Sequence, residues 1–220
     1  MKVSEYLLQE ARPIWVKYDS HPFVLGLRNG DLSRERFRYY ILQDYIYLLD
    51  YARAFSIGLA KAKSLETARL FSGYVQALTG SEMDIHRGYM GRLDITQEEL
   101  DACPTALGNI SYTSYMLRVA YEEGEAETIC AILACACSYE YIAKNMAAAR
   151  PECLEDPFYG DWVKGYVSDS YCSENVILLD SLDKLTRGYS QEQIEHLKDI
   201  FLNCSRFELG FWDLSWNMEG

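Results

Sequence analysis

The 220-residue chain lacks the sequence features of several large classes of protein. It has no cysteines spaced as CxxC, which argues against a zinc ribbon or a thioredoxin-type site. It has no Gly-rich phosphate loop and no GxGxxG motif, so nucleotide-dependent chemistry is not indicated. The start of the chain lacks the apolar core of a secretory signal, and no apolar run approaches the ~20 residues that span a bilayer. We therefore expect a cytoplasmic protein with reduced thiols and no membrane partner.

Positive charge is also scarce. Lys and Arg number 21 against 33 Asp and Glu, which gives a net charge of −12. A protein that neutralises phosphates needs a basic stripe, and none is present. We therefore expect no nucleic-acid partner, and the same shortage argues against binding to a membrane surface. By contrast, hydrophobic residues make up 49% of the chain, as in an ordinary globular protein.

Strand signals are missing as well, since there is no sustained two-residue alternation and no Asn-Gly or Asp-Gly hairpin. Apolar residues recur at helical spacing instead, most clearly over residues 37–59, with Ser33 as a plausible N-cap. Further helices are predicted at residues 3–18 (with a kink near Pro13), 65–93, 110–122, 126–147, 157–168, 173–186 and 191–217. No linker, repeat or low-complexity stretch divides the chain. We therefore predict one all-α helical bundle, a single domain over residues 1–220.

Two carboxylates interrupt predicted apolar faces. Glu208 lies in the middle of a stripe on the last helix, where an unpaired carboxylate would be costly to desolvate. Asp44 has tyrosines one turn away on each side, Tyr40 and Tyr47, an arrangement that suits a planar, hydrogen-bonding ligand. The spacing leaves other readings open, because Glu208 could form a structural salt bridge and Asp44 could bond a neighbouring tyrosine.

A thiol occupies a similar position on the helix predicted at residues 126–147. Cys135 shares an apolar face with Tyr139, which lies one turn further on, whereas Cys137 lies on another face. A buried cysteine is most often a small core residue. A reactive thiol needs a nearby base or positive field, and nothing local in the sequence supplies one for Cys135. Spacing alone therefore does not separate a nucleophile from a core residue.

Two further sets have simpler interpretations. Glu82 and His86 are one turn apart, but the di-iron pattern uses Glu-x-x-His and no second copy exists. We therefore expect no metal site, and a structural hydrogen bond between Glu82 and His86. Tyr159, Trp162 and Tyr166 form an aromatic face whose spacing is typical of a core.

Taken in order along the chain, several motifs resemble those of the TenA family, known as thiaminase II or aminopyrimidine aminohydrolase. The resemblance covers nearly the whole chain, and its most specific part is the HPF…QDxxYL block. It rests on His21-Pro22-Phe23, Gly30-Asp31-Leu32, residues 37–48 with Gln43-Asp44, Glu82…His86, Cys135-x-x-x-Tyr139, Tyr159-x-x-Trp162-x-x-x-Tyr166 and residues 207–213.

The resemblance implies a haem-oxygenase-like all-α fold, a homotetramer and an enzyme without a cofactor. It implies hydrolysis of thiamin, or of its degradation product aminomethyl-aminopyrimidine, for thiamin salvage. By position, Cys135 corresponds to the nucleophile of the family's Cys branch, Glu208 to its acid/base carboxylate and Asp44 to its substrate-binding carboxylate. The tyrosines that correspond to the lining of the pyrimidine are Tyr47, Tyr112, Tyr139 and Tyr166.

The sequence departs from the family pattern at Ala134, Cys137 and Phe207, which bear on substrate preference more than on reaction type. Three other functions are left open. One is a non-catalytic protein that binds a pyrimidine or thiamin, and another is a transcription-associated regulator, against which the charge of −12 argues. The third is a haem-degrading or quinone-cofactor oxygenase of the same fold, which has no need of a Cys/Glu pair.

Overall fold

The computed structural model describes residues 1–219, apart from the side chains of residues 81–85. No strand occurs in this described part, so the predicted all-α class is confirmed. The α-helices are α1 (Val3–Asp19), α2 (Pro22–Asn29), α3 (Arg34–Lys61), α4 (Leu65–Ala77), α5 (Met83–Arg92), α6 (Gln97–Ala102), α7 (Leu107–Glu122), α8 (Glu125–Ala149), α9 (Gly160–Val167), α10 (Asp169–Leu185) and α11 (Gln191–Asn217). A π-helix, η1 (Leu78–Glu82), and a 3₁₀ helix, η2 (Pro151–Glu155), complete the series.

The long helices lie where the apolar spacing predicts them. The helix predicted at residues 37–59 is α3, and Ser33 is its N-cap, since Ser33 Oγ accepts a hydrogen bond from the backbone N–H of Arg36 at 3.3 Å. The helix predicted at residues 65–93 is instead divided into α4, η1 and α5. The wider π turn of η1, which includes Gly80, interrupts the regular repeat that the prediction assumed.

Three short helices, α2, α6 and η2, were not expected. The pairs His21-Pro22 and Asn29-Gly30 lie at the two ends of α2 and cap it. His21 Nδ1 accepts a hydrogen bond from the backbone N–H of Phe23 at 3.2 Å, and Pro22 occupies the first helical position. Gly30 ends α2 in the left-handed conformation with φ of 78°. A helix start signal followed this closely by a stop signal marks a short helix and not a turn.

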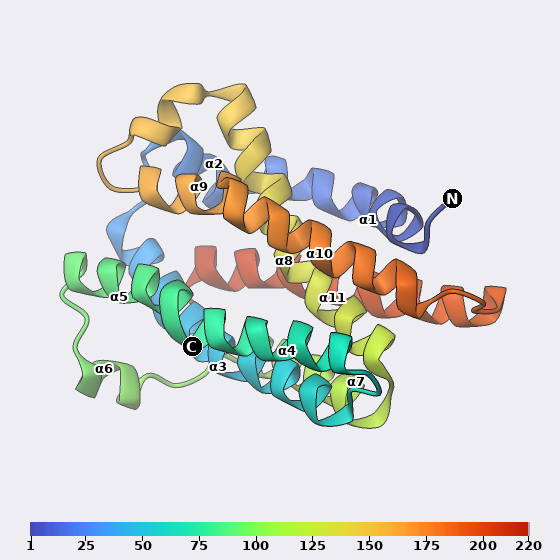
Figure 1. The fold of residues 1–220 in the computed structure, drawn as a ribbon. Coiled ribbons are helices and arrows are strands. Elements are labelled where there is room, and N and C mark those ends of the chain that lie inside the picture. Colours follow the sequence, from blue (N-terminus) through green and yellow to red (C-terminus); the bar gives the residue numbers. More distant parts are fainter. Residues whose placement is uncertain (220) are drawn as a thin grey trace. The chain divides into compact units, whose positions relative to one another are not determined.

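Residue contacts divide the chain into two compact units. Unit 1 comprises Met1–Leu32 and Ile129–Asp213, and unit 2 comprises Ser33–Thr128 and the segment from Leu214 onward. In unit 2, α3 packs against α4 and α7 (Figure 1). In unit 1, α1 packs against α10, and α9 packs against η2 and α10. Because α8 and α11 both run from one unit into the other, no linker separates them, and the single domain stays a prediction.

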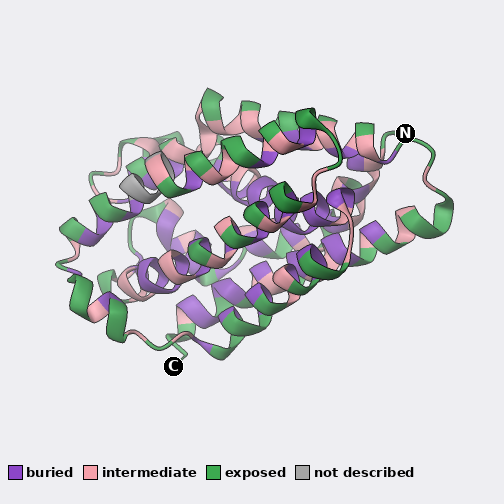
Figure 2. Cartoon of the chain, turned by 60° about the horizontal axis from the view of Figure 1, so that its bottom comes forward, coloured by how far each residue is buried: buried purple, intermediate pink, exposed green. Residues whose placement is uncertain are grey.

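Buried positions form stripes along the helices, with exposed positions on the opposite faces (Figure 2). The helix α8 is the most deeply buried of the long ones. No uninterrupted apolar run spans it, as expected from the sequence, but by length and average composition it could cross a membrane, since its most apolar window has a mean hydropathy of 1.3. However, 78% of that window is buried inside the structure, which is typical of a core helix.

The close packing of α3 on α4 predicts a stability difference between two glycines. A Cβ at Gly58 would overlap the ring of Phe71, whereas a Cβ at Gly73 on α4 would meet no atom within 4 Å. We expect Gly58→Ala to destabilise the protein by about 1–3 kcal/mol through overpacking. The control, Gly73→Ala, should stabilise it by about 0.5–1 kcal/mol, because alanine favours the helix. Denaturant unfolding measures both, and equal effects of the two variants would contradict this packing.

Candidate active site

The candidate residues fall into two groups, each inside one unit. Asp44, Tyr47 and Tyr112 belong to unit 2. Cys135, Tyr139, Tyr166 and Glu208 belong to unit 1. The two groups are described separately.

In unit 2, Asp44 pairs with a histidine. Asp44 lies on the buried face of α3 and is only 4% exposed. Its Oδ2 atom is 2.5 Å from Nε2 of His86 on α5, and both side chains are about 5% exposed. The hydrogen-bond partner of Asp44 is therefore His86. The sequence had left open a hydrogen bond to a neighbouring tyrosine instead. The expected bond between His86 and Glu82 lies outside the described residues, since the side chain of Glu82 is among those not described.

The residue before Asp44 ties α3 to the start of α7. Gln43 is 1% exposed, and its Nε2 donates to the carbonyl of Pro104 at 2.9 Å. Its Oε1 accepts from the backbone N–H of Ala106 at 3.0 Å. Asn109 Nδ2 donates to the backbone carbonyl of Gln43 at 2.8 Å. These bonds fix the register of α7 against α3, and they were not predicted, because a buried amide network leaves no periodic signal in sequence.

That register brings the tyrosines of unit 2 together. The Tyr47 and Tyr112 rings have centroids 5.1 Å apart, and the Tyr47 and Tyr51 rings stack at 5.4 Å with an interplanar angle of 26°. Tyr47 and Tyr112 are 2% and 1% exposed. Unit 2 therefore combines a buried carboxylate on α3 with aromatic faces from the same helix and from α7, the combination that suits a planar ring carrying hydrogen-bond donors.

In unit 1, Cys135 is a half-buried position on an otherwise buried stretch of helix. From Thr128 to Tyr139, every residue of α8 is buried except Cys135. Two other thiols of unit 1, those of Cys137 and Cys204, are buried and have raised pKa values. Burial raises the pKa of Cys137 well above its usual range, and Glu140 adds to the effect. Burial and then Glu208 do the same for Cys204. Accessibility thus separates Cys135 from Cys137, which spacing alone could not do.

Tyr139 lies one turn after Cys135 on α8 and belongs to an aromatic cluster formed by three helices. The Tyr139 ring on α8 lies 4.9 Å from that of Tyr166 on α9 and 5.8 Å from that of Trp162. Trp212 on α11 lies 5.2 Å from Tyr139 on another side. Trp162 is buried as predicted, but Tyr166 is only half-buried. The face predicted to be core therefore ends in a partly exposed phenol ring.

Glu208 lies in unit 1 on the buried stripe of α11 and is 1% exposed. Burial to this depth penalises the ionised carboxylate. One turn earlier, Ser205 is fixed to α1 by two bonds that the sequence did not suggest. Trp15 Nε1 donates to Ser205 Oγ at 3.1 Å, and the Tyr18 hydroxyl donates to the Ser205 carbonyl at 2.6 Å. These bonds hold the segment of α11 that carries Glu208.

Tyr18 links Glu208 and Cys135 electrostatically. Burial, followed by the negative charges of Glu208 and Cys135, holds the pKa of Tyr18 well above its usual value. Tyr18 therefore stays protonated, and its hydroxyl is a donor throughout the physiological pH range. Because both charges act on one phenol, the carboxyl group and the thiol both lie within electrostatic range of it.

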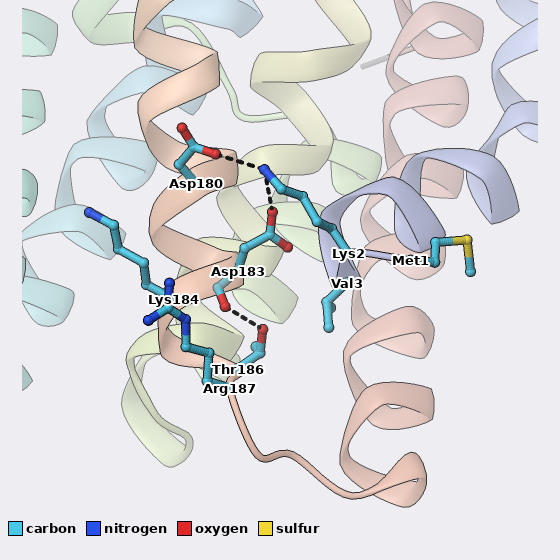
Figure 3. Close-up of a pocket in the computed structure, with 8 residues that line it drawn as sticks. All are labelled: Met1, Lys2, Val3, Asp180, Asp183, Lys184, Thr186 and Arg187. Carbon is cyan, nitrogen blue, oxygen red and sulfur yellow. Dashed lines mark hydrogen bonds and ion pairs between the residues drawn. The ribbon is translucent and has the colours of Figure 1, made fainter.

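Other features of the described residues are less suited to chemistry. No group of three or more His, Cys, Asp or Glu side chains that could hold a metal ion is found among them. A pocket of about 480 Å³ lies between the start of α1 and the end of α10 in unit 1 (Figure 3). There Lys2 Nζ is 3.1 Å from Asp180 and 3.6 Å from Asp183. The pocket is lined by none of the candidate residues.

Comparison with known proteins gives one family. Residues 8–218 match the model of the TENA/THI-4/PQQC family. An aminopyrimidine aminohydrolase from Helicobacter pylori is 46% identical over 220 residues, covering 98% of this chain and 99% of the relative. Another from Halalkalibacterium halodurans is 40% identical over 217 residues, covering 99% and 96%.

Solved structures agree with the fold. A TenA family transcription regulator from Silicibacter sp. TM1040 superposes with a TM-score of 0.89 at 30% identity, covering 98% of this chain and 96% of that one. A domain from Shewanella denitrificans OS217 with a heme oxygenase-like fold superposes with a TM-score of 0.67 at 11% identity, covering 97% and 92%. The latter likeness concerns the fold alone, and it agrees with the haem-oxygenase-like architecture expected from the sequence.

The contrast among the thiols predicts a labelling pattern. At pH 8, we expect iodoacetamide to alkylate Cys135 in the folded protein and to leave Cys137 and Cys204 unmodified. The raised pKa values keep the latter two thiols protonated at this pH, and the thiolate is the reacting form. Peptide mass spectrometry measures the modification, and unfolded protein, in which all three react, is the control. Alkylation of Cys137 as fast as Cys135 would contradict the assignment.

Proposed function

Because the chain belongs to the TENA/THI-4/PQQC family, we propose that it is an aminopyrimidine aminohydrolase of the Cys type. Its reaction is hydrolysis of the carbon–nitrogen bond at the pyrimidine methylene of aminomethyl-aminopyrimidine, of thiamin, or of both. The product is 4-amino-5-hydroxymethyl-2-methylpyrimidine, which serves thiamin salvage. The observation that carries the proposal is the accessible thiol of Cys135 on an otherwise buried stretch of α8. The names of the relatives at 46% and 40% identity support it.

The proposed reaction begins with addition of the Cys135 thiolate to the ring carbon beside the substituted one. Addition breaks the aromaticity of the ring, and the electrons arrive at a ring nitrogen, which Glu208 protonates. The lone pair of the exocyclic amino group then moves into the ring and expels the amine from the methylene. Water adds to the methylene and loses its extra proton to the released amine or to solvent. Glu208 takes its proton back from the ring nitrogen as the carbon–sulfur bond breaks, which releases Cys135 as the thiolate and restores the aromaticity of the ring.

The binding groups act on the same ring. Asp44 accepts a hydrogen bond from the exocyclic amino group, which becomes positive as its lone pair moves. Tyr47, Tyr112, Tyr139 and Tyr166 supply ring faces and hydroxyls for the pyrimidine. Orientation of this kind is worth up to about 7–11 kcal/mol in well-ordered reactions. No step needs a metal or a cofactor.

Replacement of the thiol tests the mechanism. We expect purified wild-type protein to release many equivalents of product from excess substrate, and Cys135→Ala to lose roughly 10²-fold or more in kcat, because the nucleophile is absent. The matched control is Cys137→Ala on the same helix, which should keep wild-type activity. Chromatographic measurement of the hydroxymethyl product decides between them. Near-wild-type hydrolysis by Cys135→Ala would exclude the mechanism.

Replacement of the Glu208 carboxyl group tests whether Glu208 acts in the chemical step or in ligand binding. We expect Glu208→Gln to reduce kcat by on the order of 10²–10⁴-fold, since the isosteric amide cannot deliver a proton. Binding of the product pyrimidine, measured by calorimetry, should stay within a few fold of wild type. If binding fell together with kcat, Glu208 would be a structural or ligand-binding residue rather than the acid.

The alternative is a non-catalytic pyrimidine- or thiamin-binding protein, or a regulator on the same fold. The Silicibacter relative is described as a transcription regulator. A binding protein would stop at one equivalent of ligand, so turnover with excess substrate excludes it. Direct contact with DNA suits poorly a chain that carries a net charge of −12.

We extend the proposal to a homotetramer in the cytoplasm. Several large apolar side chains of unit 2 are exposed, among them Leu107 at 78% and Ile110 at 45% on one face of α7. Leu65 and Tyr121 are exposed at 67% and 70%. Neighbouring exposed apolar side chains such as Leu107 and Ile110, one turn apart on α7, suit a surface that another subunit covers. Light scattering would test the assembly, and a molar mass of one 25.3 kDa chain would contradict it.

A further inference from the structure

The buried contact between His86 and Asp44 has no role in the reaction as set out above. Asp44 Oδ2 lies 2.5 Å from His86 Nε2, and both side chains are about 5% exposed. We infer that His86 is the positioning residue of Asp44: it holds one carboxylate oxygen and presents the other to the exocyclic amino group of the pyrimidine. The inference rests on the proposed function and specifies how its amino-group subsite is built.

The two oxygens of Asp44 differ in their partners. Oδ2 contacts His86, whereas Oδ1 has no hydrogen-bond partner within the part of the chain that the structure describes. A carboxylate removed from water needs hydrogen bonds to its oxygens to remain ionised. One donor from His86 satisfies one oxygen. The second is left to accept from a ligand that carries an N–H group, which a 4-aminopyrimidine does.

His86 reaches Asp44 through an irregular stretch of helix. It lies on α5, which follows the π-helix η1, and α5 packs against α3. A π turn has i→i+5 bonds, so it rotates the residues that follow it relative to an uninterrupted α-helix. Such turns are found frequently at functional sites. The irregularity therefore ends one helical turn before His86, the residue that meets the carboxylate.

A purely structural explanation is weaker. A buried polar pair costs desolvation of both partners, and apolar residues of similar size often give equal or greater stability. Asp44 also shares a helix with Tyr47, which lies one turn further along α3 and whose ring contacts that of Tyr112. A costly pair next to a planar-ligand surface is better explained by ligand binding than by stability.

The other histidine–aspartate contact shows what a structural pair looks like in the same protein. His21 Nε2 is 3.2 Å from Asp213 Oδ1, but the Asp213 side chain is 61% exposed. His21 also caps α2 through Nδ1. Burial lowers the pKa of His21, and Asp213 only partly offsets this. His21→Leu is therefore a matched control, in which a histidine–aspartate contact is lost without an effect on the Asp44 carboxylate.

The experiment compares two ligands by calorimetry: 4-amino-5-hydroxymethyl-2-methylpyrimidine and the analogue that lacks the ring amino group. Wild type should favour the amino compound. His86→Leu should weaken its binding by about 10-fold or more, as expected for loss of a hydrogen bond to a charged group. The same variant should leave binding of the analogue unchanged. His86→Gln, which keeps a donor near the Nε2 position, should recover most of the preference.

Two further measurements exclude a general loss of structure. The double variant Asp44→Asn with His86→Leu should bind the amino compound no more weakly than Asp44→Asn alone, since His86 acts through Asp44. In steady-state assays, His86→Leu should raise KM while kcat stays within a few fold. Control His21→Leu should keep the wild-type ratio of the two dissociation constants.

The outcomes distinguish failure of the positioning role of His86 from failure of the proposed function. If His86→Leu weakens both ligands equally, or changes neither, His86 is not a positioning residue, even if the wild type hydrolyses its substrate normally. Failure of His86→Gln to recover any preference would overturn the inference in the same way, and this variant serves if His86→Leu does not fold. If wild-type protein neither binds nor hydrolyses the aminopyrimidine, the proposed function itself is wrong, and the inference fails with it.

Discussion

A carboxyl group that leaves water for the interior of a helical protein loses its hydration, and the structure must replace it. Two of the candidate residues meet this constraint in different ways. Asp44 lies at hydrogen-bond distance from a histidine, which replaces part of its lost hydration. Glu208 is almost completely buried on α11, next to a turn that is bonded to α1. The two carboxyl groups are thus held in different surroundings, and we propose that they serve different roles, Asp44 as the acceptor and Glu208 as the acid.

The demands of burial also explain why the fold could be predicted further than the site. Apolar periodicity reports which face of a helix leaves water, so α3, α8 and α11 and the buried positions of Asp44 and Glu208 followed from spacing. The short helix α2 did not, because an N-cap with proline and a C-terminal glycine resemble a turn when they lie only eight residues apart. A helix of that length contributes too few apolar positions to show a period.

Hydrogen bonds between different helices, by contrast, could not be predicted from the sequence. The bonds of Gln43 to the segment before α7, and of Ser205 to Trp15 and Tyr18, join residues far apart in sequence and carry no periodic signal. His86 was assigned to Glu82 because an i, i+4 pair is the only partner that a single helix can suggest. Its contact with Asp44 depends on how α5 meets α3, after a π turn that the sequence did not reveal. Likewise, Cys135 is half-buried and Cys137 is buried, a difference that periodicity could not predict because it allowed a core position for both.

The electrostatics around Tyr18 keep this phenol neutral. Burial, followed by the negative charges of Glu208 and Cys135, raises the pKa of Tyr18, so the phenol adds no negative charge to its surroundings. A thiolate nucleophile together with a carboxylic acid is the pair of protonation states that addition to a pyrimidine ring requires. The deep burial of Glu208 penalises its ionised form and therefore suits the role of an acid. Cys135 is half-buried and keeps the partial contact with solvent that a thiolate needs.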